Sequence, residues 1–276
     1  MTQFDEQYKK VLWEVMNKGT EIYSKRQDCY TKALAGVVFH LDQGFPLLTL
    51  RKIPIKLFVA EQIWFLMGEK DPEVFLSKFT RIWHDFLDED GKVSTAYGYR
   101  WRKHFDKDQI KALIDLLTED PSSRHGVVVG WDPNDDIRTM GEKKKNVPCP
   151  YTFTVNIIAN KLHLHLIIRS NDLILGCPHD IAGFALLQRI LAAKLGVGTG
   201  KLTVSVSNAH VYDNHYQAAW EIMERENNHP PITLEGQKDW FDRAEKGDEQ
   251  LAKEIIEKLE SQYNPMPPIK GLKIVL

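Results

Sequence analysis

RSNDLILGCPHDIAGFALL, residues 169–187, connects the clearest strand signal of the chain to its most apolar helical segment, so the prediction of the fold begins there. Residues 151–170 alternate apolar and polar side chains in two runs with a turn near Asn160 and Lys161, which predicts a pair of strands. Residues 181–195 are strongly apolar over a helical length. We therefore predict a helix in the core directly after this pair of strands.

Outward from this stretch, weaker patterns predict further helices and strands. Apolar residues at helical spacing predict a helix over residues 4–15 that ends at Gly19, and a mostly buried one over residues 55–67 that ends at Gly68. Two shorter helices are expected over residues 110–117 and 214–225. Strands are expected at residues 37–39 and 204–206. Without a repeat or a linker, this mixture predicts one α+β domain over residues 1–276.

The segment of residues 237–262 differs from the rest of the chain because it is highly charged. Leu251, Ile255, Ile256 and Leu259 recur in it at helical spacing, which predicts a peripheral helix or a pair of helices. The expected role of its many charges is a solvated surface.

Composition argues against several classes of protein. The 36 basic and 38 acidic residues give a formal charge of -2, whereas a nucleic-acid platform normally carries a basic excess. The charged N-terminus is unlike a secretory signal, and the most apolar stretches are too short to span a bilayer. The three cysteines form no C-x-x-C pair, so no zinc knuckle is indicated. We expect a cytoplasmic protein without membrane or nucleic-acid partners.

Cys149 is the first candidate for chemistry. A lone cysteine is more often a small buried hydrophobe than a nucleophile. Cys149, however, stands between two prolines at the mouth of a predicted strand, where the backbone is stiff and poorly suited to core packing.

Eight segments, in their order and spacing, resemble the thymidylate synthase family. They are spread over most of the chain, and the pattern RS-x-D-x-x-LG-x-P with an upstream Pro-Cys is highly specific. The segments are QGFPLLT (43–49), EQIWFLMG (61–68), IWHDF (82–86), AYGYRWR (96–102), DPSSRHGVV (120–128), VPCP (147–150), RSNDLILGCPHDIAGFALL (169–187) and NAHVYDNH (208–215). The resemblance implies an α+β fold with a large mixed β-sheet packed with helices, and a sheet face at a dimer interface.

The resemblance implies covalent catalysis by Cys149. The thiol would add to C6 of a pyrimidine and make C5 nucleophilic, which splits one hard substitution into two easier steps. Arg169 would lower the pKa of the thiol and contact the nucleotide phosphate. Glu61 would be the carboxylate that relays protons through water, and Tyr97 would assist removal of the C5 proton.

The resemblance also implies a pyrimidine nucleoside monophosphate as substrate and a homodimer. Arg124 would reach across the dimer to the phosphate in the partner's active site, a task that suits a bidentate guanidinium. Ser170 would contact the phosphate or the base, and His210 and Tyr212 would hydrogen-bond the sugar 3′-hydroxyl. The family's N-terminal arginine loop is missing, and Arg26 in a shorter loop is its nearest substitute as a phosphate ligand.

The implied co-substrate is 5,10-methylenetetrahydrofolate, and no metal is expected. Asp172 would bind the pterin ring, while Ile82, Trp83, Leu175 and Gly176 would wall the folate pocket.

His163 and His165 lie two apart in a predicted strand and share a face, as two metal ligands could. No third ligand follows at a suitable spacing, so a structural or interface role is expected for them.

Asp180 departs from the family, in which Asn usually reads the base edge. An Asn amide offers a donor and an acceptor for N3–H and O4 of uracil, whereas an ionised Asp offers acceptors only. Asp suits cytosine, whose N4 amino group donates and whose N3 donates when protonated. A nearby carboxylate favours this protonated, more electrophilic ring. The pattern resembles the deoxycytidylate hydroxymethylase branch, and Asp180 joins the expected catalytic residues.

The leading hypothesis is a dCMP 5-hydroxymethyltransferase, in which water adds to the methylene carbon after folate has left. Transfer of hydride from folate, which gives 5-methyl-dCMP, stays open, as does ribose in place of deoxyribose. Thymidylate synthase acting on dUMP is the nearest rival, although Pro150 stands where that enzyme usually has His. A protein that binds nucleotide or RNA without turnover is the rival from another class.

Overall fold

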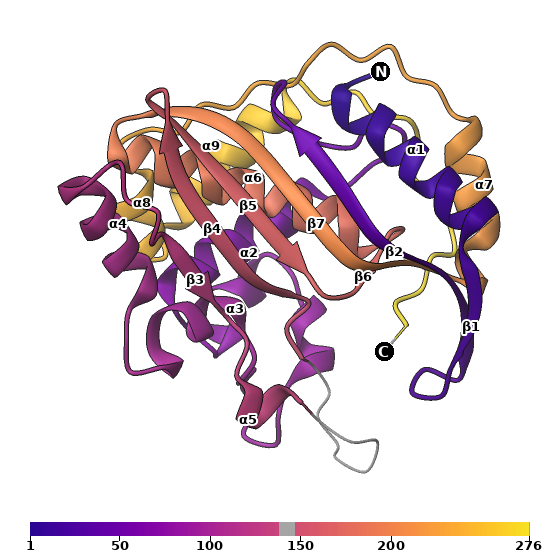
Figure 1. Cartoon of the computed structure of the whole chain (residues 1–276), viewed down its shortest axis with the longest axis horizontal. Helices are drawn as coiled ribbons and strands as arrows, with labels where there is room; N and C mark the ends of the chain where they lie inside the picture. The colour runs from indigo at the N-terminus through magenta and orange to yellow at the C-terminus, as the bar shows by residue number, and fades with distance from the viewer. Residues whose placement is uncertain (138–146, 276) are drawn as a thin grey trace.

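A single mixed β-sheet organises the computed structural model, which describes residues 1–137 and 147–275 (Figure 1). Along one path its strands run in the order β1-β2-β7-β5-β4-β3, and β6 pairs with β7 beside that path. The β5–β7 and β6–β7 pairs are parallel and the others are antiparallel. The strands are β1 (Thr20–Ser24), β2 (Cys29–Leu41), β3 (Val127–Val129), β4 (Pro150–Ile158), β5 (Lys161–Ile168), β6 (Asn171–Asp172) and β7 (Gly198–Tyr212). A mixed sheet packed with helices confirms the predicted α+β class.

The β4–β5 hairpin confirms the strand pair that the alternation predicts. Its turn is Ala159-Asn160, and both residues have positive φ, 51° and 57°. Two-residue hairpin turns require this conformation because it matches the twist of the flanking strands. The hairpin therefore returns β5 beside β4, so that the residues before β4 and after β5 meet at its open end.

Two strands are much longer than predicted. Residues 37–39 and 204–206 are only the middle of β2 and β7. Along β7 one face is polar and half-buried, with Thr203 and Ser205 between buried Leu202, Val204 and Val206. Strand length there is set by pairing with β2 and β5, which a local pattern does not report.

One face of the sheet carries the core. Phe39, Val204, Leu166 and Phe153 are register partners across four strands, so their side chains form one buried row. Phe39 contacts Phe4 of α1 (Gln3–Lys18), with ring centroids 6.1 Å apart. Phe153 contacts Phe184 of α6 (Gly176–Leu195), with ring centroids 5.9 Å apart. Both helices therefore cover the same face.

The opposite face is less buried. The neighbouring row of register partners is Val38, Ser205, Ile167 and Thr152. Val38 is 43% exposed and the other three are half-buried. In the described parts of the chain, no helix buries this face as α1 and α6 bury the other.

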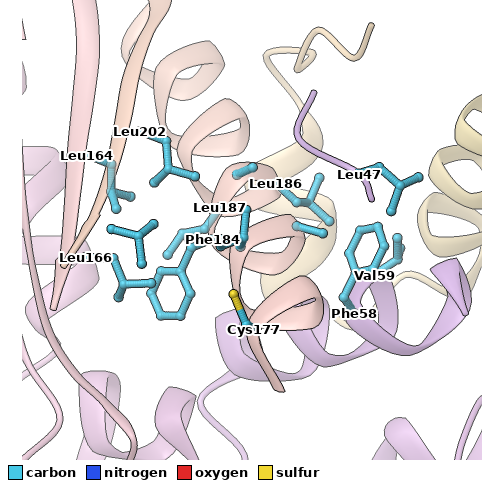
Figure 2. Close-up of a cluster of buried hydrophobic side chains, with 14 of the residues drawn as sticks. Leu47, Phe58, Val59, Leu164, Leu166, Cys177, Phe184, Leu186, Leu187 and Leu202 are labelled. Atoms are coloured by element: carbon cyan, nitrogen blue, oxygen red, sulfur yellow. The ribbon is translucent and has the colours of Figure 1, made fainter. Parts of the chain in front are cut away.

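The helix α6 (Gly176–Leu195) lies between the sheet and α2 (Ile55–Met67) (Figure 2). Phe184 and Leu187 lie toward Leu164 and Leu166 of the sheet, whereas Leu186 lies toward α2. This position explains why α6 is apolar on all sides. It starts five residues earlier than predicted, at Gly176 rather than residue 181, because a proline in the first turn of a helix removes no intrahelical hydrogen bond.

The charged segment forms α8 (Trp240–Glu245) and α9 (Glu249–Glu260), both packed against α2. The predicted pair of helices is confirmed, but the segment is more than a solvated surface. Leu251, Ile255 and Leu259 are completely buried, and Ile256 is half-buried. Its charges occupy only the outer side of two helices that complete the core.

The predicted helices at residues 110–117 and 214–225 are confirmed within a few residues, although the second opens with a 3₁₀ turn. The remaining elements are α3 (Tyr97–Tyr99), α4 (Gln109–Glu119), α5 (Pro133–Asp136), α7 (Tyr216–Glu224), the 3₁₀ helices η1 (Pro72–Val74), η2 (Leu76–Lys78), η3 (Ile82–Phe86) and η5 (Asp213–His215), and the π-helical turn η4 (Arg100–His104). Within the described residues, no helix is long and apolar enough to cross a bilayer.

Candidate active site

Cys149 and Arg169 meet at the open end of the β4–β5 hairpin. Cys149 immediately precedes β4 and Arg169 immediately follows β5, and the Arg169 amide donates a 3.0 Å hydrogen bond to the Cys149 carbonyl. The guanidinium donates to the carbonyls of Pro148 and Val147 at 2.8 and 2.9 Å. Its Nη2 lies 3.6 Å from the Cys149 Sγ. The hairpin thus fixes a cation beside the thiol.

The thiol is not activated overall by this arginine. Burial raises the pKa of Cys149 above its ordinary value, whereas the positive charges of Arg169 and Arg26 act to lower it and Asp180 raises it further. The expected effect of Arg169 is present in direction but smaller than the effect of burial. The influence of Arg26 also shows that the turn between β1 and β2 reaches toward the site.

Glu61 is a carboxyl group enclosed in apolar surroundings on α2. The indole Nε1 of Trp83, in η3, donates a 2.6 Å hydrogen bond to its Oε1. Burial raises the pKa of Glu61 to about 8, with Trp83 acting against the shift and Asp180 adding to it. Glu61 therefore holds a proton at neutral pH, in a position where an ionised carboxylate is costly.

Asp180 lies in the second turn of α6, and its charge acts on both Glu61 and Cys149. Asn171 of β6 donates a 2.7 Å hydrogen bond from Nδ2 to its Oδ2. Burial raises the pKa of Asp180 to about 7, the Asn171 bond lowers it, and Asp172 raises it. At neutral pH this group is close to half protonated.

Tyr97, at the start of α3, closes the other side of this group. Its ring packs against Trp83 with centroids 5.8 Å apart. Burial raises the pKa of its hydroxyl well above the ordinary value, and Cys149, Asp180 and Glu61 raise it further. The four residues predicted as catalytic are thus within electrostatic range of one another.

The parallel pairing of β6 with β7 brings a second set together. Asp172 is the register partner of His210, and the His210 and Tyr212 rings lie 5.0 Å apart edge to face. Burial lowers the pKa of His210 and raises that of Tyr212 to about 12. Both side chains are therefore neutral at pH 7 and able to exchange hydrogen bonds with a hydroxyl group.

Two of the residues predicted to wall the folate pocket lie beside the acidic side chains: Trp83 donates to Glu61, and Gly176 lies next to Asp172 and Asp180. Ile82 and Leu175 are their neighbours in the chain. Trp83 is 6% exposed and Ile82 and Leu175 are half-buried against the core. A Cβ on Gly176 would stand 3.8 Å from Asp180 Oδ2 and 3.9 Å from Asp172 Cβ, so glycine leaves open the space between these two acids. An apolar wall with two acids suits an aromatic ring system that carries N–H donors.

Ser170 and Arg124, two further residues predicted to bind the nucleotide, lie in different parts of the subunit. Ser170 is half-buried between Arg169 and Asn171. Arg124 is exposed in the loop before β3, where no group of the described chain pairs with it. The structure does not bring Arg124 into its own subunit's Cys149 site.

Possible metal ligands have other partners. His165 Nε2 is 2.8 Å from Ser205 Oγ, and His163 Nδ1 accepts from the Lys201 amide at 3.1 Å, as expected for structural roles.

A second set of possible metal ligands, His104, Asp132 and Asp135, surrounds a fully buried guanidinium. Arg100 lies 2.7 Å from the His104 Nε2 and 3.1 Å from an Asp135 oxygen. We interpret this cluster as an ion-pair network.

Two polar residues near the site, buried Asn171 and half-buried His179, are absent from the residues that the sequence predicted. Asn171 lies between Ser170 and Asp172, which were both predicted as ligands. This position was the one indication in the sequence that Asn171 belongs to the site. His179 donates from Nδ1 to the Leu175 carbonyl at 2.9 Å and leaves Nε2 buried without a partner among the described residues. Burial lowers its pKa to about 4.

The open end of the hairpin presents a cysteine beside an arginine, with two protonatable carboxyl groups nearby. These are the kinds of group that thiol addition and proton transfer require. The family model described as thymidylate synthase matches residues 6–272. The chain therefore belongs to the thymidylate synthase family, the folate-dependent enzymes that transfer one-carbon units to C5 of pyrimidine nucleotides. The match runs through the charged segment, which is thus part of the family fold.

Proposed function

We propose that the chain is a homodimeric dCMP 5-hydroxymethyltransferase that uses 5,10-methylenetetrahydrofolate as co-substrate. The observation that carries the proposal is Asp180, a half-buried carboxyl group at the position where the family usually has Asn. It shares its pocket with Cys149, Glu61 and Tyr97. A carboxyl group accepts from the 4-amino group of cytosine and can share one proton with N3.

Cys149 forms the covalent bond in this proposal. Its sulfur adds to C6 of the base as a thiolate, and the electron pair moves to C5, which then attacks the methylene carbon of the folate. Arg169 stabilises the thiolate. Its guanidinium can also donate charge-assisted hydrogen bonds to the phosphate of the nucleotide. Loss of the C5 proton and release of tetrahydrofolate leave an exocyclic methylene. Water adds to it, and the C6–S bond breaks.

Glu61 and Tyr97 supply the proton transfers. With a pKa of about 8, Glu61 holds a proton that it can give to a departing nitrogen and then accept one from water. Tyr97 stays protonated and can orient the water that removes the C5 proton. The Trp83 bond keeps the Glu61 carboxyl group in one orientation.

A homodimer accounts for two surfaces that the monomer leaves open. One is the sheet face with Val38 and Ile167, and the other is the exposed guanidinium of Arg124. In the proposed dimer the sheet faces meet, and Arg124 binds the phosphate in the partner's site.

Thymidylate synthesis from dUMP is the second candidate, and one observation favours it. With a pKa of about 7, Asp180 is partly protonated at neutral pH. A carboxylic acid offers one donor and one acceptor, like the Asn amide that it replaces, and could pair with O4 and N3–H of uracil.

The deciding experiment uses purified protein with methylenetetrahydrofolate and dCMP, CMP or dUMP in separate reactions, with products read by mass spectrometry. We expect 5-hydroxymethyl-dCMP. A methylated product would replace the final water addition by hydride transfer, and product from dUMP alone would overturn the cytidylate assignment. The Cys149→Ala variant is the control, with turnover abolished and nucleotide binding retained. Unchanged turnover would sink the covalent mechanism.

A further inference from the structure

Asn171 is a buried amide that the function above does not use. Its side chain is 3% exposed, and it stands in β6 directly before Asp172. Nδ2 donates a 2.7 Å hydrogen bond to Oδ2 of Asp180. Oδ1 is shielded from solvent and has no hydrogen-bond partner within residues 1–137 and 147–275. A buried amide oxygen without a partner is costly, so the position is more than a space-filling one.

The surroundings of Asp180 make this donor important. The groups that act electrostatically with Asp180 are Glu61 on α2, Tyr97 on α3, Cys149 before β4, Asp172 on β6 and Cys177 on α6 itself. All of them are acidic or neutral. Within the described chain, Asn171 is the hydrogen-bond donor to this carboxyl group.

Cytosine and uracil need opposite arrangements of hydrogen-bond donor and acceptor on the two oxygens of the Asp180 carboxyl group. Cytosine has an amino donor at position 4 and a lone pair at N3. One carboxyl oxygen must therefore accept from the amino group, and the other must share a proton with N3. Uracil presents O4 and N3–H, which need a donor and then an acceptor. A carboxylic acid satisfies either base, depending on which of its oxygens carries the proton.

We propose that Asn171 is the positioning residue that selects the base, by holding Oδ2 of Asp180 as an acceptor toward the 4-amino group of cytosine and leaving the shared proton to Oδ1, opposite N3. The inference rests on the proposed function and deepens it. Without the Asn171 donor, either oxygen takes the proton, and the site accepts uracil as well.

Two variants of Asn171 test the inference with two readouts. Asn171→Leu has nearly the same size and no donor, and Asn171→Ala has a shorter side chain without a donor in case the first variant folds poorly. The first readout is the ratio of kcat/KM for dCMP to that for dUMP. The second is the pKa of Asp180 from a ¹³C NMR titration of aspartate carboxyl groups, with its signal assigned by loss in Asp180→Asn.

We expect the dCMP to dUMP ratio to fall about 10- to 100-fold in both variants, the usual effect of losing a hydrogen bond to a charged group. The pKa of Asp180 should rise, because its ionised form loses a donor. Cys177→Ala is the matched control: it removes a buried side chain from the same pocket wall without touching the Asn171–Asp180 bond, and should leave the ratio within about threefold.

An unchanged ratio with an unchanged pKa overturns the inference. A lower pKa overturns it as well, because it would mean that Asn171 accepts from a protonated Asp180. If the unmodified enzyme turns over dUMP and not dCMP, the proposed function fails. If it turns over dCMP while the Asn171 variants keep the ratio, only the inference about Asn171 fails.

Discussion

Two half-buried carboxyl groups, Glu61 and Asp180, act electrostatically on each other, and Asp180 acts on Cys149 as well. Burial is the largest influence on both, and each is protonated to a substantial degree at neutral pH. Their hydrogen bonds, from Trp83 and Asn171, act against that shift. Both carboxyl groups can therefore donate a proton before any substrate binds. This suits a reaction in which protons are added to the base and removed from it.

Asp180→Asn should reverse the preference between the bases. The amide presents a donor and an acceptor to uracil and cannot share a proton with N3 of cytosine. We expect kcat/KM for dCMP to fall by about 100-fold or more while that for dUMP rises, the usual scale when a buried polar pairing is mismatched. Steady-state kinetics with both nucleotides measure this. Asp115→Asn, an exposed change on α4, is the control, and an unchanged dCMP preference in Asp180→Asn would contradict the role of Asp180.

Glu61→Gln should change the pH dependence of stability. The pKa of Glu61 is 4.5 as an ordinary value and about 8 in the folded protein, so the folded state binds more protons between these limits. Stability from this group is fully present below pH 4.5 and is lost as the pH rises through 8. Glutamine keeps an acceptor for Trp83 and does not ionise. We expect the variant to be more stable than the unmodified protein at pH 8.5, by on the order of 1–3 kcal/mol, and no more stable at pH 4.5.

Thermal melts at the two pH values measure this difference, and Glu235→Gln, at an exposed position, is the control. Equal effects of Glu61→Gln at both pH values would show that Glu61 is not held protonated in the folded protein.

At the scale of the element, α9 shows how a charged helix can belong to the core. Its outer positions carry lysine and glutamate, while Leu251, Ile255 and Leu259 form a completely buried stripe against α2. Asp248 caps its N-terminus by accepting from the amides of residues 250 and 251. Because α2 also carries Glu61, α9 supports the helix on which this candidate proton donor stands.

Leu251→Ala should therefore destabilise the whole protein. Removing a fully buried leucine side chain costs about 2–5 kcal/mol. The exposed Lys253→Ala, two residues away on the same helix, should change the free energy of unfolding by less than about 0.5 kcal/mol. Urea denaturation measures both. Equal, small effects of the two variants would show that α9 is a solvated surface helix, as its charged composition suggests, and not part of the core.

At the scale of the whole molecule, the proposed dimer divides each active site between two chains. Cys149 and Arg124 stand in different parts of one subunit, and the exposed Arg124 pairs with nothing in the described chain. The half-buried sheet face lies on the side away from α1 and α6. An isologous two-fold contact of that face would place each Arg124 near the other subunit.

Mixing two inactive variants tests this division. Cys149→Ala and Arg124→Glu should each lose most activity, but in a mixed dimer one site combines an intact Cys149 with an intact Arg124. We expect re-equilibrated mixtures to recover activity toward about a quarter of the unmodified level. Sedimentation confirms that subunits exchange, and exchange without recovery would place Arg124 outside the partner's site.

Elements whose signal is local can be predicted from the amino-acid sequence. The α2 helix closed by Gly68 and the β4–β5 hairpin with its Asn160 turn follow from spacing and turn chemistry, and the segment matches located Cys149, Arg169, Glu61 and Asp180. Local patterns did not report the length of β7 or the early start of α6, because pairing partners and a first-turn proline decide these.

How these residues act on one another depends on contacts that the folded chain makes between distant segments. Burial, which raises the pKa values of Cys149, Glu61 and Asp180, is a sum over neighbours that are distant in sequence. The bond from Asn171 to Asp180 needs β6 to lie beside the second turn of α6, and the buried stripe of α9 needs α2 behind it. Protonation and hydrogen bonding depend on which groups lie close together in the folded chain. The sequence therefore identifies the candidate residues, and the fold sets their protonation states and hydrogen-bond partners.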